Sequence, residues 1–287
     1  MMRGIARRAP MWLVLVLVLA TPAAAGEISF VDMFRSGFST QTGDGNSVSS
    51  AQFNFAAHLF SVNPGDFSAA ELVHPGPGSP QSLPAENPTT FGFVSPLFAT
   101  QALLDAAFPT GTYTYNATGT PSDTASFVYG ADVYPTSQPF LTGTDFSDLQ
   151  GMNPAAPFTF DFSAFAADPA ANAQFIFFSI FDPITSATVI HFGFLPRTTT
   201  NVTVPADTLL PNHPYLWEII FSNRVEVDSP GAVFLATLGF ELRTHAAFET
   251  GDATAVPEPG SLMLLAFGLM SAVGHRVYRR ARGKPSA

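Results

Sequence analysis

Residues 157–162 read PFTFDF, and this short stretch indicates the fold class. Its three phenylalanines recur at every second position and share one face, while its threonine and aspartate point to the other. A period of two over six residues is typical of a half-buried β-strand. Residues 174–181, QFIFFSIF, form a nearly continuous apolar run, as expected of a strand in the centre of a sandwich. Both stretches therefore predict strands rather than helices.

The strand pattern continues along most of the chain. Turn residues such as Pro, Asn and Asp separate further predicted strands at 111–115, 126–134, 188–194, 199–204, 215–222 and 232–242. One convincing helical pattern interrupts them, PLFATQALLDAAF at 96–108, which Pro109 ends. Several short strands without long amphipathic helices favour an all-β chain, an antiparallel β-sandwich of immunoglobulin-like or jelly-roll-like type.

Residues 73–90 are rich in proline and glycine. Proline lacks the backbone donor of a regular element, and glycine adds an entropic cost. The stretch therefore predicts a long loop, or a boundary between an N-terminal β segment at 27–72 and the main sandwich. Only the C-terminal side reads as a complete sandwich, so we expect one elaborated β domain over 26–248.

The N-terminus has the pattern of an export signal. Three arginines precede the apolar run at 11–20, and Ala23 and Ala25 occupy the small-residue positions of a cleavage site. The alternative is a transmembrane helix, but a ten-residue run is about half the length that a bilayer core needs. We expect residues 1–25 to be a signal peptide that signal peptidase removes after Ala25.

The charge of the remaining body excludes one class of partner. The two ends hold eight of the 12 basic residues and one of the 22 acidic ones, which leaves residues 26–255 with four arginines, 21 acids and a net charge of −17. Nucleic-acid binding needs clustered Lys and Arg, so no nucleic-acid partner is expected. Cysteine is absent, which excludes disulfides, thiolate metal sites and a cysteine nucleophile.

Catalytic motifs are missing from the sequence. The six histidines contain no pair spaced i, i+2 or i, i+4, and no G-x-S-x-G elbow occurs. His191 lies in the apolar run VIHFGF and reads as a core or edge residue, and His213 reads as a turn residue. We expect no enzyme activity, no catalytic residue and no cofactor. The alternative is a polysaccharide-acting hydrolase or lyase, which requires two carboxylates about 5–10 Å apart across a cleft.

A calcium site is a further hypothesis, suggested by charge and export alone. Its candidate ligands are Asp145 and Asp148, three residues apart in GTDFSDLQG, because calcium prefers oxygen ligands. The turn at Asp44 lacks the spacing of a calcium-binding loop. Solvated acids at turns are the simpler interpretation, so no metal site is predicted.

Sugar binding by a β-sandwich needs exposed aromatic rings. The candidates by residue type are Trp217 and the tyrosines at 113, 115, 129, 134 and 215. Trp217 lies in YLWEIIF, where both alternating faces are partly apolar, which predicts a place in the core.

The C-terminus carries a separate pattern. The polar spacer at 249–255 is followed by Val256, Pro257, Glu258 and Pro259, whose two prolines keep the chain extended. An apolar run of about 14 residues then predicts a hydrophobic helix of about 21 Å, short for a hydrocarbon core of about 30 Å. Arg276, Arg279 and Arg280 form a membrane stop that stays cytoplasmic, and 281–287 form a basic tail.

This C-terminal pattern resembles the PEP-CTERM sorting signal of Gram-negative bacteria. The Pro-Glu-Pro triplet, the hydrophobic helix and the arginine cluster of 256–280 occur in the same order. The resemblance implies that an exosortase recognises Pro257, Glu258 and Pro259 and removes the helix. Family members are typically associated with extracellular polysaccharide and biofilm. The resemblance thus implies an exported chain that meets the inner membrane transiently and reaches the cell surface, outer envelope or extracellular matrix.

Part of the body resembles an immunoglobulin-like unit of bacterial secreted proteins. The matching turn is V-x-V-P-A-x-x-L, with Val202, Val204, Pro205, Ala206 and Leu209. This resemblance supports a fold and implies no chemistry. We therefore expect a structural, adhesive or glycan-contacting protein; a polysaccharide hydrolase or lyase is the first alternative and a calcium-dependent adhesin the second.

Overall fold

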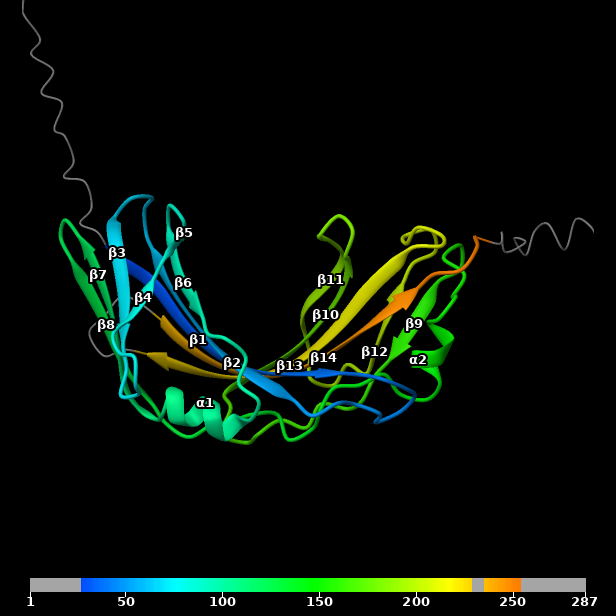
Figure 1. Cartoon of the computed structure of the whole chain (residues 1–287), viewed down its shortest axis with the longest axis horizontal. Helices are drawn as coiled ribbons and strands as arrows, with labels where there is room; N and C mark the ends of the chain where they lie inside the picture. Colours follow the sequence, from blue (N-terminus) through cyan, green and yellow to red (C-terminus); the bar gives the residue numbers. More distant parts are fainter. Residues whose placement is uncertain (1–26, 229–234, 254–287) are drawn as a thin grey trace, which may run out of the picture.

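The computed structural model describes residues 27–228 and 235–253, and β-strands dominate it (Figure 1). The strands are β1 Ile28–Thr40, β2 Gln52–Ser61, β3 Phe67–Val73, β4 Gln81–Leu83, β5 Ala85–Asn87, β6 Thr90–Val94, β7 Gly111–Gly119, β8 Asp123–Tyr129, β9 Phe158–Asp161, β10 Ala173–Asp182, β11 Ala187–Leu195, β12 Asn201–Val204, β13 Pro214–Asp228 and β14 Leu235–Glu249. The helices of these residues are short, α1 Gln101–Ala107 and α2 Asp145–Asp148. The predicted all-β class is confirmed.

The strands form one large sheet and two smaller ones. The large sheet has eight strands in the order β11-β10-β13-β14-β1-β2-β6-β5, and the smaller sheets are β4-β3-β7-β8 and β12-β9. Neighbouring strands run antiparallel as predicted, except that β1 and β14 pair in parallel from Phe30↔Leu235 to Thr40↔His245. Parallel pairing needs a long connection between the two strands, and here most of the chain supplies it.

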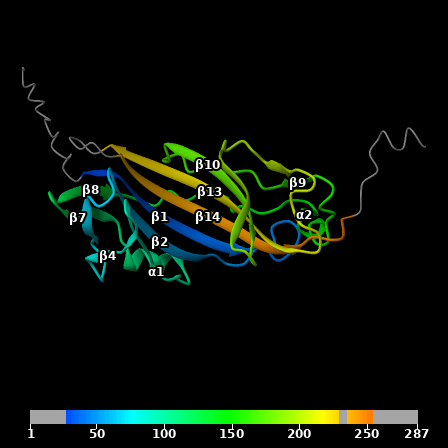
Figure 2. The ribbon, with the colours of Figure 1, turned by 90° about the horizontal axis from the view of Figure 1, so that it is seen from above.

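The two longest strands line two separate cores. Alternate residues of β13 point to one side of the sheet, so its N-terminal half supplies Tyr215, Trp217 and Phe221 to one core and its C-terminal half supplies Val225 and Val227 to the other. Figure 2 shows β1, β13 and β14 running along the length of the molecule. In Figure 1 the large sheet is bent, and the two smaller sheets lie on its outer side, one at each end. Its concave side is left without a covering sheet.

The stretch PFTFDF forms β9 and the start of the next connection, as its alternation predicts. Phe160 and Phe162 are buried, whereas Thr159 and Asp161 are exposed. The Phe160 ring contacts the Phe178 ring of β10 edge to face at 4.8 Å between centroids. This packing joins the two-stranded sheet to the large sheet.

Three details of the predicted elements are wrong. The loop predicted at 73–90 contains β4 and β5, three residues each, because short proline-free stretches still pair with neighbouring strands. The strand predicted at 126–134 ends at Tyr129. The helix predicted at 96–108 begins at Gln101, because the hydroxyl of Thr100 accepts a hydrogen bond from the Leu103 amide and caps it.

Several predicted features lie outside the described residues. These are the signal peptide at 1–25 and the sorting segment at 256–280 with its hydrophobic helix. Within residues 27–228 and 235–253, no helix is long and apolar enough to span a membrane. The N-terminal strands β1 and β2 share the large sheet with β13 and β14, so the chain returns from both sides of 73–90 to one sheet.

Candidate functional site

The concave face of the large sheet carries a polar band across its central strands. Strand register places Asn54 of β2, Ser36 of β1, Glu241 of β14 and Ser222 of β13 side by side. These positions alternate with residues that enter the two cores, so they point away from the smaller sheets. Along β13 and β14, the band lies close to the point where the opposite face changes from one core to the other.

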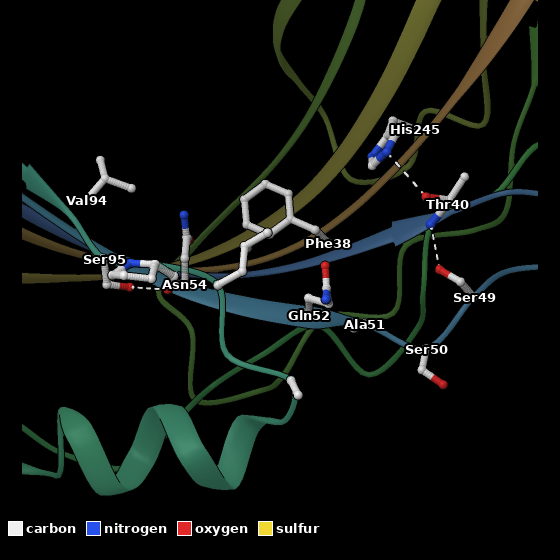
Figure 3. A pocket seen from close by; sticks show the side chains of 13 residues that line it. Phe38, Thr40, Ser49, Ser50, Ala51, Gln52, Asn54, Val94, Ser95 and His245 are labelled. Atoms are coloured by element: carbon white, nitrogen blue, oxygen red, sulfur yellow. Dashed lines mark hydrogen bonds between the residues drawn. The ribbon is translucent and has the colours of Figure 1, made fainter.

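Two adjoining grooves lie along this face, and Phe38, Asn54 and Val94 line both of them. The larger groove has a volume of about 1020 Å³ and extends past the end of β6 toward the β1–β2 connection. The smaller one has a volume of about 360 Å³ and reaches the polar band. Figure 3 shows Phe38 and Asn54 projecting into the larger groove, with His245 and Thr40 at one end and Val94 at the other. We call the two together the concave groove.

Glu241 is the most enclosed acid of the concave groove, with 3% of its surface exposed. Its carboxylate accepts hydrogen bonds from the Ser36 hydroxyl at 3.1 Å and the Ser222 hydroxyl at 3.2 Å. The Arg243 guanidinium donates two more, from Nε at 3.0 Å and from Nη2 at 2.6 Å. Four hydrogen-bond donors therefore compensate for the burial of this carboxylate.

Arg243 connects this carboxylate to a second acid and to an aromatic ring. Its Nη1 lies 3.8 Å from Oε1 of Glu218, and its guanidinium lies 5.3 Å from the centre of the Phe38 ring. Burial raises the pKa of the Glu218 carboxyl, against the opposing effect of Arg243. Burial also lowers the pKa of His245, the cross-strand neighbour of Glu218. Two glutamates with different environments thus lie together on the concave face.

Arg224 has a different environment from Arg243. Its guanidinium carbon lies 5.4–5.6 Å from the ring centres of four phenylalanines, Phe34, Phe175, Phe177 and Phe194. The rings come from β1, β10 and β11, so only the assembled sheet brings them together. At these distances each ring attracts the cation through its quadrupole. Among the described residues, no carboxylate lies within ion-pair distance of this guanidinium.

Another charged cluster lies on the outer side of the sheet. Arg35 of β1 is buried and contacts Tyr129, Asp105 and Asp132, and Gln101 donates a hydrogen bond to Asp132 at 2.8 Å. Burial raises the pKa of Asp132, while the nearby Arg35 opposes this effect. The cluster fastens α1 and the residues after β8 to β1, which is a structural role.

The candidate aromatic rings for sugar binding are buried or half-buried. Trp217 is fully buried, as its sequence context predicts. Of the tyrosines that were candidates by residue type, those at 113, 115, 129 and 215 are buried, and Tyr134 is half-buried against the core, so none is an exposed platform. Tyr113, Tyr115 and Tyr129 lie in one core and Tyr215 in the other, where their rings fill space between sheets. The rings that face the concave groove are phenylalanines instead.

The candidate calcium ligands are used in local hydrogen bonds. Asp145 accepts from the Asp161 amide at 2.6 Å, Asp148 accepts from the Thr144 hydroxyl at 2.7 Å, and Asp44 accepts from Ser147. Within the described part of the chain, no group of three or more His, Cys, Asp or Glu side chains is placed to hold a metal. The structure thus gives these acids a role in fastening α2 to its neighbours.

The two histidines examined in the sequence occupy the positions expected of them. His191 lies on the edge strand β11 and its Nδ1 is 2.9 Å from the Ser179 hydroxyl. His213 lies in the turn before β13, with its Nε2 at 3.2 Å from Asp182. Neither residue lines the concave groove.

Sequence reasoning missed Glu218, Arg224, Glu241 and Arg243. Each is a charged residue in a strand that also carries apolar residues for a core, and burial of a charge normally requires a partner. That pattern could have singled them out individually. Their common location could not be found without the register of the strands.

Comparison with known families bears on the C-terminus. Residues 255–280 match the PEP-CTERM protein-sorting motif. The chain carries this sorting motif. The match supports export, processing by an exosortase and sorting to the cell surface or outside the cell. The predicted motif residues at 256–259, the arginines at 276, 279 and 280 and the cleavage-site alanines at 23 and 25 lie outside the described residues.

The comparisons say little about the body of the chain. No curated protein matches its sequence. Among solved structures, trypsin-activated alpha-2-macroglobulin from Escherichia coli is similar at 12% identity, over 76% of this chain and 15% of that chain, with a TM-score of 0.22. A likeness at this level carries no argument about fold or function.

Proposed function

We propose that this PEP-CTERM protein is a structural or adhesive component of the cell surface or extracellular matrix, and that its concave groove binds polysaccharide. The observation that carries the proposal is the groove itself. It combines phenylalanine rings with hydroxyl and amide side chains on a face that neither smaller sheet covers. Rings offer apolar surface to sugar faces, and Ser, Asn and Gln side chains can both donate to and accept from sugar hydroxyls.

The sorting motif supports the same proposal. Export and exosortase processing bring the protein to the compartment where extracellular polysaccharide is found. An acidic body of net charge −17 suits a soluble extracellular surface. The proposal includes an association of the protein with biofilm and exopolysaccharide.

One observation favours a second candidate, a polysaccharide hydrolase. Glu218 and Glu241 lie together on the concave face, and burial raises the pKa of Glu218 as a general acid would require. However, four donors already occupy the Glu241 carboxylate, and Arg243 lies between the two acids. This arrangement fits a structural ion pair better than a nucleophile and an acid.

Binding assays with insoluble polysaccharides test the proposal. We would measure retention of the full chain, purified in detergent, and compare it with Phe38→Ala, which removes a ring that lines both grooves. The matched control is Leu103→Ala, which removes an exposed side chain of α1 away from the groove. We expect F38A to lose retention and L103A to keep it. Equal retention by both variants would place binding elsewhere.

The same samples decide between binding and hydrolysis. New reducing ends that appear with the intact chain and disappear with Glu218→Gln would establish the hydrolase and overturn the binding role. Intact-mass analysis of the native protein tests the route of export. A C-terminus near Pro257-Glu258-Pro259 supports exosortase processing, whereas a full-length C-terminus contradicts it.

A further inference from the structure

The phenylalanine cluster around Arg224 is built from distant parts of the chain. Phe34 comes from β1, Phe175 and Phe177 from β10, and Phe194 from β11. The rings also contact one another, with Phe194 lying 5.3 Å from Phe175 and 5.1 Å from Phe177, both edge to face. The guanidinium is thereby held in one place on the concave face.

Arg224 is the arginine of the large sheet that lacks an acidic partner among the described residues. Arg35 contacts Asp105 and Asp132, and Arg243 contacts Glu241 and Glu218. The guanidinium of Arg224 makes no hydrogen bond to any described residue, and its Nε is buried without a partner. A donor left in that state costs free energy unless a ligand or water completes it.

An arginine in this state is suited to one kind of ligand group. Its planar fork matches a carboxylate bidentately, and it gives up water more readily than an ammonium does. Because the surrounding rings already hold it in place, little side-chain entropy remains to be lost when a carboxylate binds. The chain has 21 acids in its body, yet none of the described acids fills this position.

The ring of Phe194 adds a second recognition element beside the charge. It is 63% exposed and its backbone has a φ of 54°, in the left-handed region that a bulky residue rarely adopts. Phe194 thus offers an apolar surface next to the guanidinium on the edge strand β11. A sugar ring that bears a carboxylate, a uronic acid, presents the matching pair of groups.

The position on the sheet favours a sugar over an acidic peptide. Extended peptides bind sheets at an edge, where backbone groups are unpaired. Arg224 lies in β13, an inner strand whose backbone pairs with β10 and β14, so only side chains face the ligand there. Aromatic rings and a fork of N–H donors can recognise the apolar face and the planar carboxylate of an acidic sugar without backbone pairing.

We infer that Arg224 and its four phenylalanines form a subsite for the carboxylate of an acidic sugar residue, so that the polysaccharide bound by the concave face contains uronic acids. The inference rests on the proposed function, because it assigns a ligand class to the same face. It accounts for the unpaired arginine and the exposed ring together.

Alginate and a matched neutral polymer test the inference. The neutral probe is the same alginate after chemical reduction of its carboxyls to alcohols. Affinity of the full chain is measured at about 0.15 M salt, where a Debye length of about 8 Å screens the repulsion between an acidic protein and an acidic polymer. We expect alginate to bind more tightly than its reduced form. Equal affinity for the two polymers would overturn the inference.

Substitution of Arg224 gives the second arm of the test. We expect Arg224→Gln to weaken alginate binding by about 10- to 100-fold, as loss of hydrogen bonds to a charged group implies, and to leave the reduced polymer unaffected. Arg197→Gln is the matched control, because it removes the same charge from the exposed turn after β11. If R197Q weakens binding as much as R224Q, net charge explains the effect and the inference is wrong.

Further outcomes separate this inference from the proposed function. Phe194→Ala, at an exposed ring, covers the case in which R224Q fails to fold, and it should also weaken alginate binding. If the chain binds reduced alginate as well as it binds alginate, the binding role stands and the acidic subsite fails. If it binds neither polymer, nor any insoluble polysaccharide, the proposed function itself fails. Equal affinity for poly-glutamate and alginate would overturn the assignment to a sugar.

Discussion

Replacing Glu241 by glutamine tests the charged centre of the concave groove. The substitution keeps the shape of the side chain but removes the charge that Ser36, Ser222 and Arg243 share. Loss of one partner of a buried ion pair costs about 3–5 kcal/mol. Arg243 keeps Glu218 at 3.8 Å and is partly exposed, so the lower end, about 3 kcal/mol, applies.

Thermal unfolding followed by circular dichroism measures this effect. In a domain of this size each kcal/mol shifts the Tm by about 2–4 °C, so E241Q should lower the Tm by roughly 6–12 °C. The control is Glu226→Gln, which changes an exposed acid of β13 on the same concave face of the sheet. It should change the free energy of unfolding by less than about 0.5 kcal/mol.

A Tm of E241Q equal to that of the intact chain would refute the reasoning, since the carboxylate would then not hold Arg243 or the two serines. The double variant with Arg243→Gln refines the test. We expect a coupling energy of about 0.5–3 kcal/mol between the two substitutions, whereas strictly additive effects would mean that the pair is not coupled.

Three further predictions address other parts of the molecule. The hydrogen bond that His58 donates to the Asp32 carboxylate raises the pKa of His58, against the effect of burial. The stability that the pair contributes is therefore complete below about pH 6.5 and is lost as pH rises through the higher folded pKa. The gap in urea midpoint between the intact chain and His58→Gln should shrink from pH 6 to pH 9, and a gap that widens would contradict the assignment. Trp217→Ala, at a fully buried site, should lower the free energy of unfolding by about 3–5 kcal/mol in urea titrations, and a loss below about 1 kcal/mol would mean that the ring is not packed as described. Asp145→Ala should lower the free energy of unfolding by about 1–2 kcal/mol, because the hydrogen bond from the Asp161 amide is lost. A chelator should leave the Tm of the intact chain unchanged. A drop in Tm with chelator that D145A abolishes would instead establish a calcium site.

Local sequence patterns predicted individual strands well where one face is apolar throughout. PFTFDF is β9, and QFIFFSIF lies within β10, because burial of alternate or continuous apolar side chains follows directly from the sequence. The same reasoning predicted that this strand ends at residue 222, although β13 continues to Asp228. Polar Ser222, Asn223 and Arg224 interrupt the apolar pattern there. The structure accommodates the first two through Glu241 and the Val133 carbonyl.

The candidate site was beyond sequence reasoning for a related reason. Alternation places Glu241 and Arg243 on one face of β14, but their further partners, Ser36, Ser222 and Glu218, come from β1 and β13, far away in the chain. The phenylalanine cluster around Arg224 likewise needs rings from three other strands. Register decides which side chains become neighbours, and a shift of one residue would turn each of them to the opposite face.

The sequence by itself determines the all-β class and the C-terminal sorting motif, because both depend on contiguous patterns: the alternation of apolar residues and the order of triplet, apolar run and arginines. Only the tertiary structure decides which face of each strand is covered. Alternation defines two faces, but the parallel pairing of β1 with β14 and the packing of both smaller sheets on one side leave the concave face open. The groove, the buried Glu241 carboxylate and the ring-bound Arg224 lie on an open face because both smaller sheets pack on the other side.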